Sequence, residues 1–178
     1  MKAVLIVFIV MISMLSAAEP KKDSWWMGSD FGIGKINSKN NIYSFRTEYS
    51  FADTNGIVFT FDYHWLGQAI AMGSNKYKSN GIGFQLGKIV YNMKPFIVYP
   101  AIGLELASMT EGIGELQPGY LGGDYEDYDT HQIFYVTGSV VGQYKFLYSR
   151  LELGYQRDYS YMFVQLGMRF GRFYMKEQ

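Results

Sequence analysis

From Trp25 onward, apolar residues recur at every second position, which is the period of a β-strand and not of a helix. Segment 57–66 shows the pattern best, and segments 42–51 and 161–173 repeat it. In 57–66, one face carries Ile57, Phe59, Phe61, Tyr63 and Trp65, and the other carries Val58, Thr60, Asp62, His64 and Leu66. The alternation predicts an all-β chain in which each strand has one apolar and one mixed face.

The pattern divides the chain into about eight segments of roughly ten residues, the length that a tilted strand needs to cross a lipid bilayer. We expect strands near residues 25–36, 42–51, 57–66, 80–91, 95–107, 131–144, 148–157 and 161–173. Short turns follow the second, fourth and sixth segments, whereas loops at 67–79 and 108–130 follow the third and fifth. This asymmetry is typical of outer-membrane barrels. We therefore predict an eight-stranded antiparallel up-and-down transmembrane β-barrel with both termini on the periplasmic side.

Aromatic residues are frequent, with 16 Tyr, 13 Phe and 3 Trp among 178 residues, and they cluster near the ends of the predicted strands. Membrane barrels place such residues in two rings at the lipid interfaces. The ring near the short turns would comprise Trp25, Trp26, Phe51, Tyr91, Phe96, Tyr144, Tyr148 and Phe173, and the ring near the loops Tyr43, Tyr63, Trp65 and Tyr161. Alternation alone leaves open a soluble lipocalin-like barrel with its apolar face inward. The aromatic content favours lipid outside.

The N-terminus has the features of a secretory signal peptide. Lys2 precedes an apolar run from Ala3 to Leu15, and small residues end at Ala18. A membrane anchor is the alternative, but a spanning helix needs about 20 apolar residues and this run is shorter. We expect residues 1–18 to be removed and residues 19–178 to form the barrel domain.

Composition excludes several other classes of protein. The 16 basic and 16 acidic residues cancel, so the chain has no electrostatic footprint for nucleic acid. The chain contains no Cys, which rules out disulfides, thiolate metal sites and a Cys nucleophile. We expect no nucleic-acid partner.

Segment 25–173 resembles the small eight-stranded outer-membrane barrels of the OmpA/OmpX type. The resemblance rests on the strand pattern, together with the closing segment 165–173, which is similar to the terminal strand that such proteins present to the barrel-assembly machinery. Residues 174–178 follow that strand, whereas the family usually ends on the aromatic. The resemblance implies the outer membrane of a Gram-negative-type bacterium, contact with outer-membrane lipid and lipopolysaccharide, the assembly machinery as a partner during biogenesis, and a monomer.

The face opposite the apolar one carries charges of both signs. An eight-stranded barrel is only wide enough for its own side chains, so these charges should pair inside a filled lumen. The predicted polar network comprises Asp30, Arg46, Glu48, Asp62, His64, Glu105, Arg150, Glu152 and Arg169, with Gln85 and Gln156 on the same face. A polar pore or a catalytic cleft is the alternative.

Two histidines, His64 and His131, are candidate general bases. Lipid A deacylase barrels carry a His-x-Ser pair on one strand, and here His64 is followed by Trp65-Leu66 and His131 by Gln132-Ile133. No dinucleotide or phosphate-loop motif is present. We predict that the chain is not an enzyme and has no cofactor and no resident metal.

The longer connections supply candidate binding residues for surface contacts. They are Lys76, Lys78, Glu111, Glu115, Asp124, Glu126, Asp127 and Asp129. Connection 108–130 has no Lys or Arg, and its carboxylates at 124–129 offer oxygen ligands for a divalent cation, but they lack the Gly placement and terminal Glu of an EF-hand loop, so a solvated surface loop is the favoured interpretation. The lysines would suit lipopolysaccharide phosphates.

Two residues within the predicted strands break the pattern. Pro100 lacks a ladder donor, which predicts either a bulge or a weak seam in the wall. Lys88 falls on the lipid face and would have to extend toward the interface.

The sequence thus favours an integral outer-membrane barrel with a structural or surface-interaction role: envelope integrity, adhesion or ligand contact through its extracellular loops. Transport of small or hydrophobic solutes by a narrow or lateral route is the first alternative. A lipid-A-modifying barrel enzyme is the second.

Overall fold

The computed structural model describes residues 23–37, 40–67, 77–93, 95–119 and 122–172. The predicted signal peptide 1–18, its boundary and Lys76 lie outside these residues. The strands are β1 (Ser24–Ile36), β2 (Asn40–Ala52), β3 (Ile57–Gly67), β4 (Tyr77–Lys88), β5 (Tyr91–Met93), β6 (Phe96–Gly119), β7 (Gly122–Tyr144), β8 (Leu147–Tyr155) and β9 (Tyr161–Arg172). The described part of the chain has no helix of the length and apolarity that crossing a membrane requires.

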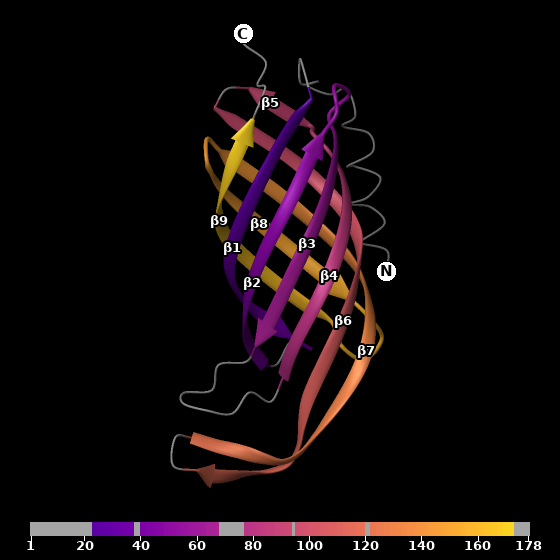
Figure 1. Ribbon diagram of the computed structural model, residues 1–178, viewed down its shortest axis with the longest axis vertical. Coiled ribbons are helices and arrows are strands. Elements are labelled where there is room, and N and C mark those ends of the chain that lie inside the picture. Colours follow the sequence, from indigo (N-terminus) through magenta and orange to yellow (C-terminus); the bar gives the residue numbers. More distant parts are fainter. Residues whose placement is uncertain (1–22, 38–39, 68–76, 94, 120–121, 173–178) are drawn as a thin grey trace.

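The strands form a closed barrel in which every pairing is antiparallel (Figure 1). β1 pairs with both β2 and β9, and β4 pairs with β6 to close the sheet. Strands β4 and β5 pair in succession with β6, so together they make one strand of an eight-stranded wall. The predicted all-β, eight-stranded antiparallel barrel is confirmed.

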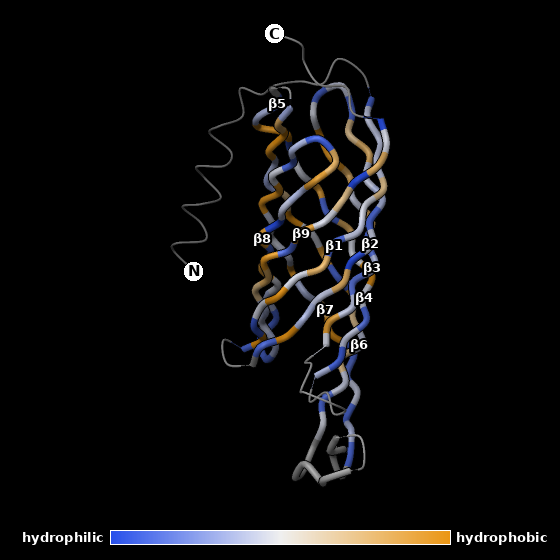
Figure 2. The backbone as a smooth tube through the Cα atoms, turned by 90° about the vertical axis from the view of Figure 1, so that its left-hand side faces the viewer, coloured by the Kyte–Doolittle hydropathy of each residue, from blue (hydrophilic) through white to orange (hydrophobic). Residues whose placement is uncertain are grey.

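Burial alternates along each strand and shows which face is outside. On β9, Met162, Val164 and Leu166 are exposed, whereas the residues between them are buried. Leu166 is 68% exposed and Phe61 on β3 is 60% exposed, values that would be costly in water for so many neighbouring apolar residues. Figure 2 shows the corresponding alternation of hydrophobic and hydrophilic positions along the wall. The apolar face is therefore the outer one, and the lipocalin-like alternative is wrong.

The largest difference from the sequence prediction lies in residues 108–130, which were expected to form a loop. Residues 108–119 and 122–130 continue β6 and β7 as a paired hairpin in which Gly119 is opposite Gly122, with one register shift between Ile113 and Leu116. The hairpin projects past the other strands, at the end of the barrel opposite β5 (Figure 1). Beyond Met109, the last buried apolar residue of β6 that the structure describes, the sequence no longer alternates apolar and polar residues, although backbone pairing continues.

The two predicted belts of aromatic residues around the barrel are present in part. Trp25, Phe51, Tyr91, Phe96 and Tyr144 are exposed near the short-turn end, and Tyr43 and Tyr63 are exposed near the other end. Trp26, Tyr148 and Tyr161, however, are buried inside the barrel, so their assignment to the rings was wrong. The reason is the two-residue period of the strand, which lets only one of Trp25 and Trp26 face outward. Phe173 lies outside the described residues.

Pro100 lies on β6 beside the gap between β4 and β5. Gly87 is opposite Ala101 and Tyr91 is opposite Val98, so four steps along β4–β5 match three along β6. This extra residue makes a bulge at Ile89–Val90, where the Ile89 N–H donates to the Gly56 carbonyl at 2.8 Å instead of to β6. The bulge thus interrupts the hydrogen-bond ladder between β4–β5 and β6 beside Pro100, the residue that has no backbone N–H to donate.

Lys88 faces outward at the end of β4, in the register that the sequence predicts. Its ammonium group donates to the backbone carbonyl of Asn55 in the turn between β2 and β3. The lysine therefore reaches the polar rim of the barrel along its own aliphatic stem.

Candidate functional site

The barrel interior contains a cluster of charged side chains contributed by six strands, β1, β2, β3, β6, β8 and β9. The residues are Asp30, Arg46, Glu48, Asp62, His64, Glu105, Arg150, Glu152 and Arg169, each at most 7% exposed. Residues two apart on one strand, such as Arg46 and Glu48, share the inward face because of the strand period. The structure thus places all nine residues of the predicted network in the lumen. Gln85 is also buried, whereas Gln156 accepts from the backbone N–H groups of Asp158 and Tyr159 in a turn.

Two arginines and two carboxylates form the first group within this interior. Glu48 accepts from Arg150 and, at 2.5 Å, from the Nε of Arg169. Asp30 Oδ2 lies 3.4 Å from Arg150 Nη1 and accepts from the Tyr148 hydroxyl at 2.6 Å. The Arg169 guanidinium also lies 4.0 Å from the centre of the Tyr148 ring. Each charge here has an opposite charge in contact, as burial demands.

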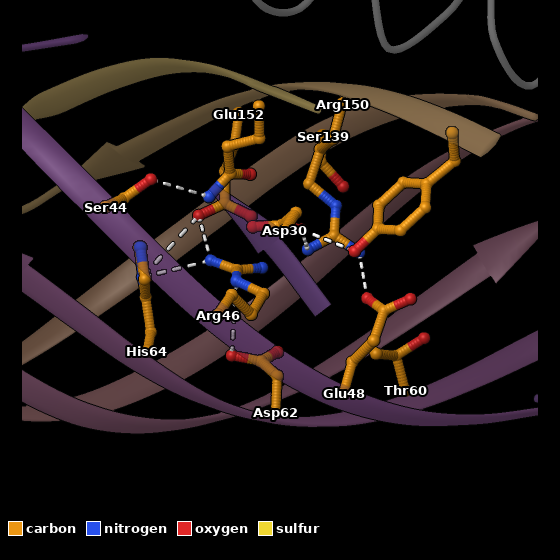
Figure 3. Close-up of polar contacts among 12 residues, drawn as sticks. Asp30, Ser44, Arg46, Glu48, Thr60, Asp62, His64, Ser139, Arg150 and Glu152 are labelled. Carbon is orange, nitrogen blue, oxygen red and sulfur yellow. Dashed lines mark hydrogen bonds and ion pairs between the residues drawn. The ribbon is translucent and has the colours of Figure 1, made fainter. Parts of the chain in front are cut away.

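Arg46 is the centre of the second group (Figure 3). Its Nη2 donates to Glu152 and lies 3.0 Å from His64 Nδ1, and its Nε lies 3.7 Å from Asp62 Oδ1. Glu105 has no guanidinium in contact among the described residues: it lies 3.4 Å from His64 Nδ1 and accepts from the Tyr161 hydroxyl at 2.7 Å. This group holds more acid than base.

Amides and glycines complete the interior. Gln85 donates to Glu152 at 3.1 Å and accepts from Ser139 at 3.1 Å. Gly81 and Gly83 on β4 face the carboxylates of Glu105 and Asp62, and a Cβ atom would stand only 2.5 Å and 2.8 Å from their oxygens. Glycine at these positions gives the two acids room.

Apolar layers close both ends of the polar interior. One layer lies toward the hairpin end and contains Ile36, Leu66, Met109, Tyr135 and Phe163; the other lies toward the short-turn end and contains Trp26, Val58, Ile97, Tyr99 and Val141. The sequence prediction missed these layers, although strict two-residue parity would have assigned Trp26, Tyr148 and Tyr161 to the inward face. Among the described residues, these two apolar layers therefore cover the charged groups on the hairpin side and on the short-turn side of the lumen.

The predicted surface residues lie apart from this interior. Glu111 and Asp129 stand opposite each other at the base of the hairpin, where like charges disfavour pairing. Glu111 accepts from the Tyr159 hydroxyl at 2.9 Å, and Asp129 lies 3.1 Å from His131 Nε2. Burial, together with the hydrogen bond to Glu111, raises the pKa of Tyr159 to about 12. Each acid thus has its own local partner.

The other surface candidates are not gathered into one site by the structure. Lys78 on β4 lies 5.9 Å from the centre of the Tyr128 ring, and Asp127 is exposed. Glu115, Asp124 and Glu126 lie on the hairpin strands, but their side chains are outside the described part of the structure. The cation-binding interpretation of 124–129 therefore remains a prediction.

Comparison with known proteins supports the fold. No protein-family model matches the chain, and no curated protein is significantly similar to it in sequence. Solved structures are similar in fold: the Neisserial surface protein A has 14% identity and a TM-score of 0.63 over 82% of this chain and 95% of its own. The attachment invasion locus protein Ail of Yersinia pestis has 10% identity and a TM-score of 0.50 over 85% and 99%.

A third solved structure, the N-terminal β-barrel domain of Pseudomonas aeruginosa OprF, has 10% identity and a TM-score of 0.50 over 82% of this chain and 97% of its own. The chain thus has the fold of the small eight-stranded outer-membrane barrels, as the sequence resemblance implied. The predicted location in a Gram-negative-type outer membrane agrees with these neighbours and with the apolar outer face.

Proposed function

We propose that this protein is a non-catalytic outer-membrane anchor that holds the β6–β7 hairpin at the cell surface as an interaction arm. The hairpin itself is the observation that carries the proposal. β6 loses its partner β4 at Glu111, and β7 loses its partner β8 at Val136, yet β6 and β7 stay paired to Gly119 and Gly122. A paired arm presents its side chains in a fixed order at lower conformational cost than a free loop.

The composition of the arm suggests the chemistry of its partner. Residues 108–130 contain six carboxylates and no Lys or Arg. Of these, Asp127 and Asp129 are exposed. A single-sign surface attracts the opposite sign and raises the rate of encounter. The arm is therefore suited to a cationic surface or a basic protein segment.

The proposal is tested by shortening the arm. Thr110 and Thr130 are opposite each other, so an Asn-Gly turn can replace residues 111–129 without changing the barrel register. The shortened protein should keep its fractionation with the outer membrane and its heat-modifiable mobility on gels, and cells that carry it should lose binding to poly-L-lysine beads. Unchanged bead binding by a correctly folded shortened protein would contradict the role of the arm.

A charge variant separates chemistry from shape. The double substitution Asp127→Asn and Asp129→Asn should reduce bead binding while the arm remains. Asp158→Asn is the matched control, because Asp158 is exposed on a neighbouring connection at the same end of the barrel. Because the control removes one charge and the double variant removes two, a loss in Asp158→Asn about half as large as that of the double variant would mean that total surface charge, not the arm, governs binding.

Two lysines at the same end suit lipopolysaccharide. Lys35 and Lys78 are exposed near the hairpin end of β1 and β4. Phosphate groups bind such lysines as point charges. We include lipopolysaccharide contact, and recognition by the barrel-assembly machinery during biogenesis, in the proposed function.

The two alternative functions have direct tests. The closed lumen argues against transport, so planar-bilayer recordings should show no stable conductance steps, and large steps would revive the pore. Within the described residues, no Ser hydroxyl hydrogen-bonds to His64 or His131. The mass spectrum of lipid A should therefore be the same with and without the protein, and an altered acyl pattern would favour an enzyme.

A further inference from the structure

The buried interior has an imbalance of charge. It holds five carboxylates, from Asp30, Glu48, Asp62, Glu105 and Glu152, against three guanidinium groups, from Arg46, Arg150 and Arg169. With His64 neutral, the described interior carries two negative charges in excess. An uncompensated buried charge is strongly unfavourable, so protons or a bound cation must balance the excess.

The excess is concentrated where three metal-binding side chains converge. One ligand atom from each of His64, Glu105 and Glu152 lies within 4.8 Å of the other two, and all three residues are buried. His64 Nδ1 lies 3.4 Å from Glu105 Oε2 and 4.0 Å from Glu152 Oε1. Ligand atoms around one tetrahedral zinc ion are roughly 3 to 4 Å apart. The three atoms thus already lie at nearly the spacing that a bound ion requires.

We infer that His64, Glu105 and Glu152 bind one divalent transition-metal ion inside the barrel. Two positive charges cancel the two excess negative charges of the interior, with His64 neutral as a ligand must be. An imidazole nitrogen with two carboxylates suits zinc and its neighbours in the transition series better than calcium or magnesium, which prefer oxygen ligands alone. The site is independent of the proposed surface arm.

Binding of this ion requires the Arg46 guanidinium to move, and Asp62 is placed to receive it. Arg46 Nη2 occupies the space beside His64 Nδ1 and Glu152, where it would repel a cation. Asp62 lies on the other side of the same guanidinium, 3.7 Å from its Nε, and neither of its oxygens has a hydrogen-bond donor. Turning the guanidinium toward Asp62 frees the histidine nitrogen and supplies donors to an acid that lacks them.

Tyr161 lies between the two carboxylates. Its hydroxyl is 2.7 Å from Glu105 Oε2 and 3.1 Å from Glu152 Oε1, so its one proton is within donating distance of either acid and closer to Glu105. Such outer partners fix the ligands of metal sites and add to affinity. The apolar layer that contains Leu66, Met109 and Phe163 lies between the site and the hairpin end of the barrel. The ion would therefore enter during folding, before the barrel closes, and would stay trapped afterwards.

The test measures metal retained by the full-length mature protein in detergent. The protein is unfolded in urea and refolded with a slight excess of Zn²⁺, then passed through a chelating column before elemental analysis. About one zinc ion per chain is expected to remain. The chain has only two histidines, so His64→Asn and His131→Asn form a matched pair. The first should lose the metal and the second, with its imidazole exposed on the surface, should retain it.

A second measurement needs no variant to fold. Refolding the unmodified protein with Co²⁺ should give visible absorption bands of a nitrogen- and oxygen-ligated ion, and the His64 imidazole resonances should shift while those of His131 do not. Absence of retained zinc together with absence of these bands would overturn the inference and assign charge balance to protons. Retention that His131→Asn abolishes would overturn it as well, because the metal would then be on the surface.

Discussion

The lumen and the hairpin are both rich in acids, but they hold them in different surroundings. In the lumen, Glu48 contacts two arginines and Glu152 contacts a third, with the side chains fully buried. At the base of the hairpin, Glu111 and Asp129 face each other, with a phenol and an imidazole as their partners. Around the hairpin, water stabilises the carboxylate charge, whereas inside the barrel a guanidinium group has to do so. The difference teaches that the same residue type is structural in one region and available for contact in the other.

The largest effect should come from breaking a buried ion pair. Arg150→Ala leaves Asp30 and Glu48 without their shared guanidinium, so the free energy of unfolding should fall by about 3–5 kcal/mol. Urea unfolding in lipid vesicles measures this loss. Arg157→Ala, at an exposed position near the hairpin end, is the control and should change stability by less than about 0.5 kcal/mol. If the two variants lost similar amounts of unfolding free energy, the proposed difference between buried and exposed charges would be wrong.

An intermediate effect is expected on the outer wall. Leu166→Arg places a charge in the middle of β9 on the lipid face and should cost about 2–4 kcal/mol in the same assay. Gln132→Arg introduces the same side chain at an exposed position beside the hairpin and should be nearly neutral. A neutral Leu166→Arg would mean that this face is in contact with water and not lipid.

The smallest effect concerns the contact at the base of the hairpin. The pKa of Tyr159 is about 12 when folded, and the ordinary tyrosine value is about 10. Because the folded pKa is the higher one, this contact contributes fully below about pH 10 and is lost as the pH rises through about 12. Tyrosine ring-carbon NMR follows the titration, and Tyr159→Phe assigns the signal.

Glu111→Gln provides the matched control for that titration. Removing the acceptor's charge should move the pKa of Tyr159 down toward the ordinary value, since the negative charge of Glu111 opposes ionisation of the phenol. A titration near pH 10 in the unmodified protein would show that the hydroxyl is not held by Glu111.

Most of the wall could be predicted from the sequence because lipid selects one face and the packed lumen the other. Because both faces are constrained, apolar and polar residues alternate in β2, β3 and β9. The same alternation predicts which charged residues point into the lumen. The hairpin could not be predicted in this way, because beyond Met109 the residues up to 130 show no two-residue alternation of apolar and polar side chains. Their strands are held by backbone pairing, which imposes no alternation of apolar and polar side chains.

The candidate site divides in the same manner. The sequence by itself determined that Arg46, Glu48, Asp62 and His64 share an inward face, since parity along a strand is a local property. Only the tertiary structure decided that Glu105, from 41 residues beyond His64, and Glu152 meet that histidine. When the barrel closes, the number of strands and their tilt together fix how far each strand is shifted relative to its neighbours. Neighbours across the lumen are therefore a property of the closed barrel and not of any one segment.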